Sequence, residues 1–164
     1  MSDFSYHLAR MIAAPPAEVF RAWTQAPLLA EWWGPHALFN PECEIEAKPG
    51  GRLRILMREP GGTDLLVTGT VRECLPERSL HLDLRVPSCQ AGPAESPTDL
   101  TVTVTFSDAD GSTQLAVRIH FETPASRERC LEAGLATGWE EGLDSLSALL
   151  RTLLTNPPKN RPNP

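Results

Sequence analysis

The sequence predicts a two-layer α+β domain in which one long helix covers one face of an antiparallel sheet. Apolar and polar residues alternate with a period of two from about residue 41 to residue 121. After residue 123, leucines and one tryptophan recur every three or four residues, as on a helix with one apolar face. Because the sheet is apolar on one side only, the long helix has a surface to cover.

The first part of the chain predicts one strand and two short helices. "SYHLARMI" (residues 5–12) alternates as a strand does, and "APPAEVFRAWTQ" then changes to a helical period. Pro15 and Pro16 suit the first turn of a helix. "LLAEWW" forms a second short helix, which Gly34 and Pro35 end. In that helix Trp32 is expected in the core, and Trp33 is the better pocket residue.

About six strands follow as an antiparallel meander. In the first hairpin, strand parity places Glu44 opposite Arg54, so opposite charges meet on the outer face. Asp110 and Gly111 predict a two-residue type I′ turn. Continuing the parity of Val67 and Val71 would point Glu73 inward, so we expect a β-bulge or a strand end near Glu73.

The C-terminal segment predicts a helix of about 30 residues, with Thr123 as its N-cap and Pro124 in its first turn. Gly134, Gly138 and Gly142 lie along it at a spacing of four. Each glycine weakens a helix by about 1 kcal/mol relative to alanine. The glycines therefore indicate close approach of another backbone, or a helix that starts or bends in this region.

Composition limits the class of protein. The 164 residues carry a net charge of −6, which argues against a nucleic-acid partner. No apolar run is long enough to enter a membrane, and no signal peptide is visible, so we expect a cytoplasmic protein. The four cysteines lack CxxC spacing and are expected as free thiols or as small core residues. We expect a single domain over residues 1–155 and a disordered proline-rich tail over residues 156–164; the proline-rich stretch near residues 86–99 predicts a long surface loop.

The sequence carries no constellation that predicts a catalytic or metal site. None of the four histidines lies within three to five residues of another histidine or of a cysteine, and neither HExxH nor GxSxG occurs. We therefore predict no metal, no cofactor and no catalytic residues. His36 and Glu73 are the polar side chains that could reach an interior; the competing interpretation places His36 in a solvated loop and Glu73 at a strand end.

Several stretches, in order along nearly the whole chain, resemble one known superfamily. They include "AAPPAEVFRAWTQAPLLAEWWGP", "KPGGRLRILM", "GTVRECLPERSLHL" and "GWEEGLDSLSALL". The chain resembles the START-like (SRPBCC) superfamily, and within it the heat-shock-protein-90 ATPase activator homologue branch. This resemblance implies a helix-grip fold: a curved seven-stranded antiparallel sheet wrapped around the long C-terminal helix. It also implies an interior cavity that holds apolar ligands.

An apolar interior of this kind favours binding of a hydrophobic small molecule or lipid. The residues that we place near the ligand are Trp32, Trp33, His36, Met57, Glu73, Trp139 and Leu143. For each of them, filling of the core is a competing interpretation. Trp23 shares a helix face with Val19 and Phe20, and is interpreted as core.

Two other functions stay open, because this fold hosts several. One is a cyclase- or dehydratase-like enzyme acting on an aromatic or polyketide-type substrate, which requires a polar pair inside the cavity. The other is a co-factor of a chaperone ATPase. We do not expect a chaperone partner, because the co-chaperone that gives the branch its name has a separate N-terminal domain that this sequence lacks. A homodimer is compatible with the threonine-rich outer face of the sheet or with the leucine-rich helix end.

Overall fold

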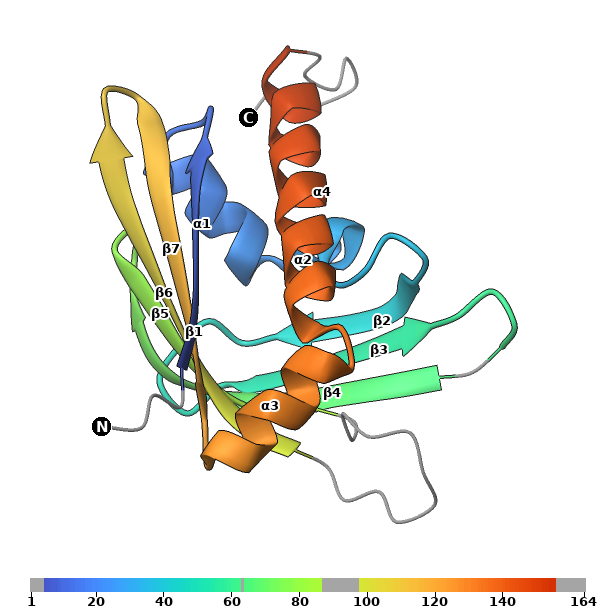
Figure 1. Cartoon of the computed structure of the whole chain (residues 1–164). Helices are drawn as coiled ribbons and strands as arrows, with labels where there is room; N and C mark the ends of the chain where they lie inside the picture. Colours follow the sequence, from blue (N-terminus) through green and yellow to red (C-terminus); the bar gives the residue numbers. More distant parts are fainter. Residues whose placement is uncertain (1–4, 63, 87–97, 156–164) are drawn as a thin grey trace.

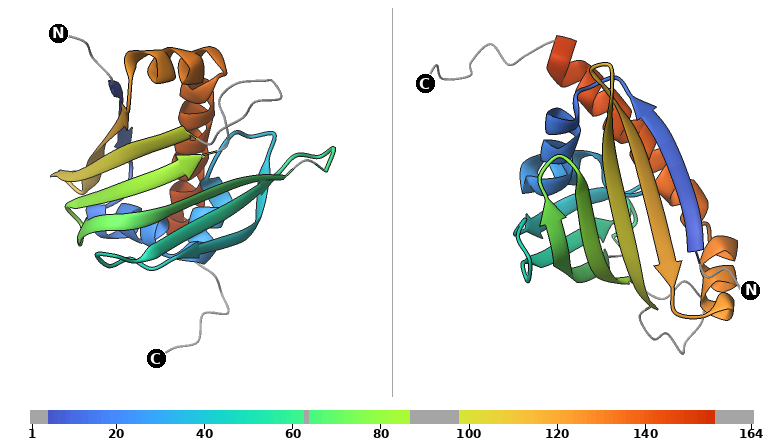
Figure 2. Two further views of the ribbon diagram at one scale, coloured as in Figure 1. Left: turned by 90° about the horizontal axis from the view of Figure 1, so that it is seen from below. Right: turned by 90° about the vertical axis from the view of Figure 1, so that its left-hand side faces the viewer.

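A curved antiparallel sheet forms one layer, and the helices lie on one of its faces (Figure 1, Figure 2). The computed structural model describes residues 5–62, 64–86 and 98–155. Within these residues there are seven strands and four helices: β1 (Ser5–Ile12), α1 (Pro16–Thr24), α2 (Ala26–Trp32), β2 (Phe39–Ile45), β3 (Arg52–Arg58), β4 (Asp64–Leu75), β5 (Ser79–Val86), β6 (Thr98–Ala109), β7 (Ser112–Phe121), α3 (Pro124–Glu132) and α4 (Leu135–Thr155).

The strands β2 to β7 form an antiparallel meander, and β1 adds to its edge beside β7. Its order is β1-β7-β6-β5-β4-β3-β2, and every neighbouring pair is antiparallel. β1 pairs with β7 from Ser5↔His120 to Ile12↔Thr113, so the N-terminal strand lies at the edge next to the last one. This arrangement confirms the predicted α+β helix-grip fold with two short helices after the first strand.

The two hairpins that the sequence specified most closely have the predicted form. Asp110 and Gly111 both have positive φ, at 55° and 86°, and Ala109 pairs with Ser112 across them. This is the two-residue turn expected for an Asp-Gly pair. Glu44 lies opposite Arg54 as predicted, although the carboxylate that Arg54 contacts is the diagonal one of Glu42, at 2.6 Å.

β4 departs from regular pairing at the predicted place. The register against β5 shifts between Val71 and Glu73, and Glu73 is exposed opposite His81. Closer to the start of the strand, a Cβ atom built on Gly69 would lie 2.3 Å from the carbonyl oxygen of Asp83. The close approach of β4 and β5 therefore depends on glycine at this position.

The C-terminal helical segment consists of two helices and not of one. Thr123 caps the N-terminus of α3: its side chain accepts a hydrogen bond from the Ser126 backbone N–H at 3.0 Å. α3 ends near Gly134, which has a φ of 97° that breaks the run before α4 starts. The prediction of one helix over about 30 residues is wrong, whereas the expected break in the glycine region is confirmed.

The core lies between the concave face of the sheet and the helices. Alternate residues of β3 to β7 point into it, and α4 adds Leu143, Leu146 and Leu150, all at most 2% exposed. Within the described residues, the buried polar side chains are Ser5, Thr113 and Ser126, none of which is an acid or a base. No helix in the described part of the chain is both long and apolar enough to cross a membrane.

The cysteines correct one expectation. Cys43 and Cys74 carry free thiols, but Cys130 is disulfide-bonded, so the prediction of free thiols is wrong for Cys130. The expected proline-rich loop lies largely outside the described residues, and the expected C-terminal tail lies wholly outside them.

Candidate functional site

All four tryptophans of the chain meet where α1, α2 and α4 come together. Trp23 packs edge-on against Trp32, with ring centroids 4.7 Å apart, and Trp32 lies 5.9 Å from Trp33. Trp33 packs edge-on against Trp139 at 5.3 Å, and Trp139 stacks on Trp23 at 6.2 Å. The four rings thus form a closed circuit, which we call the tryptophan junction (Trp23, Trp32, Trp33 and Trp139).

The helices α1 and α2, together with the residue that follows α2, supply three of these rings. α1 buries Val19, Ala22 and Trp23 on one face, as its amphipathic pattern predicts. α2 buries Trp32 at its last position, and Trp33 is already extended, with φ −63° and ψ 131°. Because the chain leaves the helix at Trp33, the two adjacent indoles both reach the interior, at 2% and 7% exposure.

Small residues on α4 bring the fourth ring into place. A Cβ atom built on Gly142 would lie 3.4 Å from the backbone N of Gly34, and one on Gly138 would lie 3.3 Å from Cγ of Pro35. The backbone of α4 therefore packs directly on the Gly-Pro segment after Trp33. Trp139, between these two glycines in sequence, contacts Trp23 and Trp33.

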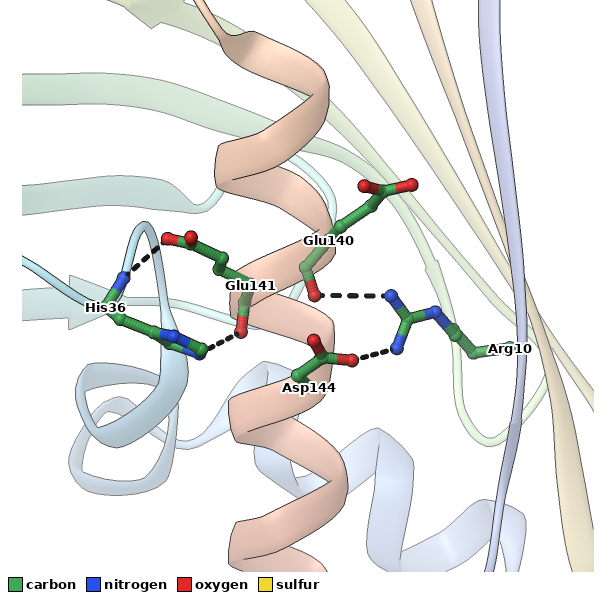
Figure 3. Close-up of polar contacts among 5 residues, drawn as sticks. All are labelled: Arg10, His36, Glu140, Glu141 and Asp144. Atoms are coloured by element: carbon green, nitrogen blue, oxygen red, sulfur yellow. Dashed lines mark hydrogen bonds and ion pairs between the residues drawn. The ribbon is translucent and has the colours of Figure 1, made fainter.

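Two polar side chains hold α4 from opposite sides at the exposed rim of the junction (Figure 3). The backbone N–H of His36 donates to the Glu141 carboxylate at 3.0 Å, and His36 Nε2 donates to the Glu141 carbonyl oxygen at 3.0 Å. From β1, the guanidinium of Arg10 pairs with Asp144 and donates to the Glu140 carbonyl oxygen at 3.3 Å. These contacts join α4 to β1 on one side and to the segment after α2 on the other.

The polar atoms inside the junction are not all paired. Trp32 Nε1 donates to the carbonyl oxygen of Ala22 at 2.9 Å. Trp23 Nε1 is buried and has no hydrogen-bond partner among the described residues. Asn40, which follows the junction, donates through Nδ2 to the carbonyl oxygens of Ala30 and Trp33, both at 2.9 Å, while its Oδ1 has no partner in the described structure.

The structure gathers most, but not all, of the residues predicted from the sequence. Trp32, Trp33 and Trp139 are in ring contact, and Met57 and Leu143 are buried in the same apolar core. His36 lies at the exposed rim, bonded to α4. Glu73 is separate from them: it is exposed on the outer face of the sheet.

Trp23 is the member of the junction that sequence reasoning assigned to the core alone. Its helix face identifies it as buried but gives no information about which residues it meets. The available signal in the sequence was the position of the four tryptophans. Two of them are adjacent, and the other two lie on helix faces that are expected to pack inward.

A hollow of about 690 Å³ lies on the outer face of the sheet, lined by residues of β4, β5, β6 and β7 and by none of the tryptophans. Threonines of β4 and β6 line it, together with the ion pair of Arg85 and Asp99, whose two hydrogen bonds measure 2.8 and 3.0 Å. This pairing lowers the pKa of Asp99, chiefly through the hydrogen bond from Arg85. Within this lining, Arg85 and Asp99 therefore satisfy each other's charge.

The described residues hold neither a metal site nor an activated thiol. No group of three or more His, Cys, Asp or Glu side chains in the described ranges could hold a metal ion. Burial, with a smaller effect of Glu44, raises the pKa of Cys43 to about 11, and burial raises the pKa of Cys74. Both thiols are therefore poor nucleophiles at neutral pH.

Comparison with protein families places the chain. The family model described as "Activator of Hsp90 ATPase homolog 1-like protein" matches residues 13–151. The chain belongs to this family. The matched range contains the whole tryptophan junction and the His36–Glu141 contact, whereas Arg10 lies before it. No match is found among functionally curated proteins.

Solved structures show that this member of the Activator of Hsp90 ATPase homolog 1-like family has the START-like fold. A protein from Nitrosomonas europaea is 22% identical and superposes with a TM-score of 0.82 over 94% of this chain and 99% of that one. A protein from Rhodobacter sphaeroides is 26% identical, with a TM-score of 0.80 over 93% and 95% of the two chains. The AHSA1 protein from Silicibacter pomeroyi is 20% identical, with a TM-score of 0.72 over 90% and 97%.

Proposed function

We propose that this chain binds an apolar small molecule or lipid at the tryptophan junction, beneath α4. The observation that carries the proposal is the closed circuit of four indole rings built from three helices. Binding sites for apolar molecules are lined mainly by hydrophobic and aromatic side chains, with few polar groups. The junction has this composition, and Met57 and Leu143 belong to the same buried apolar core.

We propose that a ligand enters the tryptophan junction past Trp139. Trp23, Trp32 and Trp33 are buried, whereas Trp139 is partly exposed. A ring that contacts solvent on one side and two buried indoles on the other can move aside at lower cost than a ring enclosed in the core. We therefore assign to Trp139 the role of a movable wall between solvent and the interior.

The polar side chains favour binding over acid–base catalysis. An enzyme of the cyclase or dehydratase type would need a titratable group near the substrate. His36 donates to α4 at the exposed rim, and Glu73 is on the other side of the sheet. In the described residues, no acidic or basic side chain is buried beside the tryptophans.

Quenching of tryptophan fluorescence by 1-bromonaphthalene tests the proposal, because bromine quenches indoles that it contacts. We expect saturable quenching in the wild-type chain and weaker binding in Trp139→Ala. Leu154→Ala is the matched control, since Leu154 is an exposed apolar residue at the far end of the same helix. Quenching that never saturates, together with native mass spectra free of any copurified organic molecule, would overturn the proposal.

The family description supports a second candidate, stimulation of an Hsp90-type ATPase. Its test is the ATP turnover of a purified Hsp90 with and without this chain. A rise that saturates with chain concentration supports this function, and unchanged turnover at saturating concentrations rejects it.

A further inference from the structure

One indole N–H of the tryptophan junction has no acceptor. Trp23 is 1% exposed, its Nε1 is buried, and no described residue accepts a hydrogen bond from it. Trp32, only nine residues further along the chain and equally buried, donates to the Ala22 carbonyl oxygen at 2.9 Å. Of these two neighbouring buried indoles, Trp32 therefore has a hydrogen-bond acceptor for its N–H and Trp23 has none among the described residues.

An unpaired buried donor calls for an explanation. In folded proteins roughly nine in ten buried polar groups have a partner, and a buried tryptophan usually finds one for its N–H. A donor without an acceptor lowers stability, because it has lost its bond to water and gained nothing in return. An acceptor that arrives with a ligand would restore the bond.

A resident water at this N–H would need polar partners of its own. Buried waters are held by two to four polar partners. Three aromatic rings lie against Trp23, those of Trp32, Trp139 and Phe106. The N–H of Trp32 is already committed to the Ala22 carbonyl oxygen, so it is not a further donor to such a water.

We infer that Trp23 Nε1 is the polar contact for the ligand of the tryptophan junction, and that this ligand is a flat apolar molecule with a neutral acceptor oxygen, such as a ketone or an ester. The inference rests on the proposed binding function and narrows its ligand class. A pure hydrocarbon would leave the N–H unpaired. An anion would need a cation in the interior, and no lysine or arginine is buried in the described residues.

The test uses two probes of nearly the same shape, 2-acetylnaphthalene and 2-isopropenylnaphthalene, which differ by a carbonyl oxygen in place of a methylene group. In ¹⁵N-labelled protein the four indole N–H signals are followed during titration. We expect the acetyl probe to move the Trp23 proton downfield and to bind roughly 2- to 10-fold tighter than its hydrocarbon partner. The Trp32 signal stays in place, because its N–H keeps the Ala22 acceptor.

Variants separate the N–H from the ring. Trp23→Phe keeps an aromatic ring and removes the donor, so the preference for the acetyl probe should disappear. Trp139→Phe is the matched control: it alters the same junction but leaves Trp23 Nε1, so the preference should persist. If Trp23→Phe does not fold, the wild-type titration still decides, because the shift of the Trp23 signal is the direct observation.

The outcomes distinguish this inference from the function on which it rests. If both probes bind equally and the Trp23 signal does not respond to the carbonyl, the inference is overturned and the binding function stands. If neither probe binds, the proposed function fails and the inference fails with it. A Trp23 signal that shows contact with water in the free protein and no change with either bound probe also overturns the inference.

Discussion

The indole rings of Trp23 and Trp139 stack with centroids 6.2 Å apart and planes inclined by 21°. This contact joins the first helix of the chain to the last one. It closes the circuit that Trp32 and Trp33 begin, and it places a partly exposed ring against a fully buried one. The covering helix is thus held by aromatic packing on its inner side and by polar contacts from His36 and Arg10 at its rim.

Replacing Trp139 by alanine removes two ring contacts of this circuit. We expect Trp139→Ala to lower the free energy of unfolding by about 2–4 kcal/mol, somewhat less than for a fully buried tryptophan. Trp139→Phe should lose less than half of that amount, since it keeps most of the stacked area. Urea unfolding followed by circular dichroism measures both. A loss no larger than that of Leu154→Ala, expected within about 0.5 kcal/mol of wild type, would contradict the role given to the ring.

Gly69 should not tolerate a side chain. A Cβ atom there would lie 2.3 Å from the Asp83 carbonyl oxygen and 2.8 Å from Cδ2 of Leu84, and β5 is paired with β6 on its other side. We expect Gly69→Ala to destabilise the protein by about 1–3 kcal/mol or more, measured by urea unfolding.

Gly61→Ala is the matched control for Gly69→Ala. No atom lies within 4 Å of a Cβ at Gly61, and its φ lies outside the left-handed region. Alanine there restricts the unfolded chain, so stability should stay level or rise by about 0.4–1 kcal/mol. Equal effects of the two substitutions would show that the close approach of β4 and β5 is not specific to Gly69.

The sheet could be predicted from the sequence because its rules are local. Side chains alternate strictly along a strand, so the parity of Val67 and Val71 located the bulge before Glu73. The Asp110-Gly111 pair predicted its own turn for the same reason: the backbone conformation is a property of those two residues. Where a pattern is local, as in these cases, composition and spacing are sufficient.

The tryptophan junction could be predicted only in part, because it depends on tertiary approach. The glycine spacing on the last helix indicated a close neighbour but not that the neighbour is the backbone of Gly34 and Pro35. A helix face identifies Trp23 as buried, yet the missing partner of its N–H emerges only when all surrounding acceptors are placed. Strand parity predicted the irregularity near Glu73, but it did not determine which face of the sheet the Glu73 side chain lies on. In the structure that side chain is exposed, opposite His81.

Cys43 should react slowly while the protein is folded. Burial, with a smaller contribution from Glu44, raises its pKa to about 11, so very little thiolate exists at pH 8. We expect alkylation by iodoacetamide, followed by peptide mass spectrometry, to be far slower in the folded protein than in urea. The folded-state rate should climb about tenfold per pH unit until the pH nears 11. Equal rates in folded and unfolded protein would refute the shift.

The same shift gives an alkaline stability change with a definite sign. The unfolded chain releases the Cys43 proton near the ordinary thiol pKa of roughly 8.5, before the folded chain does. Stability from this group is therefore complete below that pH and is lost as the pH rises toward 11. Cys43→Ala should show a smaller loss of stability over this window, measured by urea unfolding at each pH. A wild-type profile that matches the variant would refute the assignment.

The Arg10–Asp144 pair should affect α4 locally and overall stability little. Both side chains are partly exposed, so we expect a double-mutant cycle of Arg10→Met and Asp144→Asn to give a coupling of about 0.2–1 kcal/mol that falls at high salt. Because Arg10 also donates to the Glu140 carbonyl oxygen, Arg10→Met should raise amide hydrogen exchange in the turn of α4 around residues 140–144.

Arg85→Met is the matched control for the hydrogen-exchange measurement on Arg10→Met. Arg85 makes an exposed ion pair of the same kind with Asp99, but within the sheet and away from α4. Its loss should change overall stability by a similar small amount and leave exchange in α4 unaltered. If Arg10→Met and Arg85→Met give the same exchange pattern in α4, the contact from β1 does not position the covering helix. The tryptophan contacts, together with His36, would then have to hold α4 in place without it.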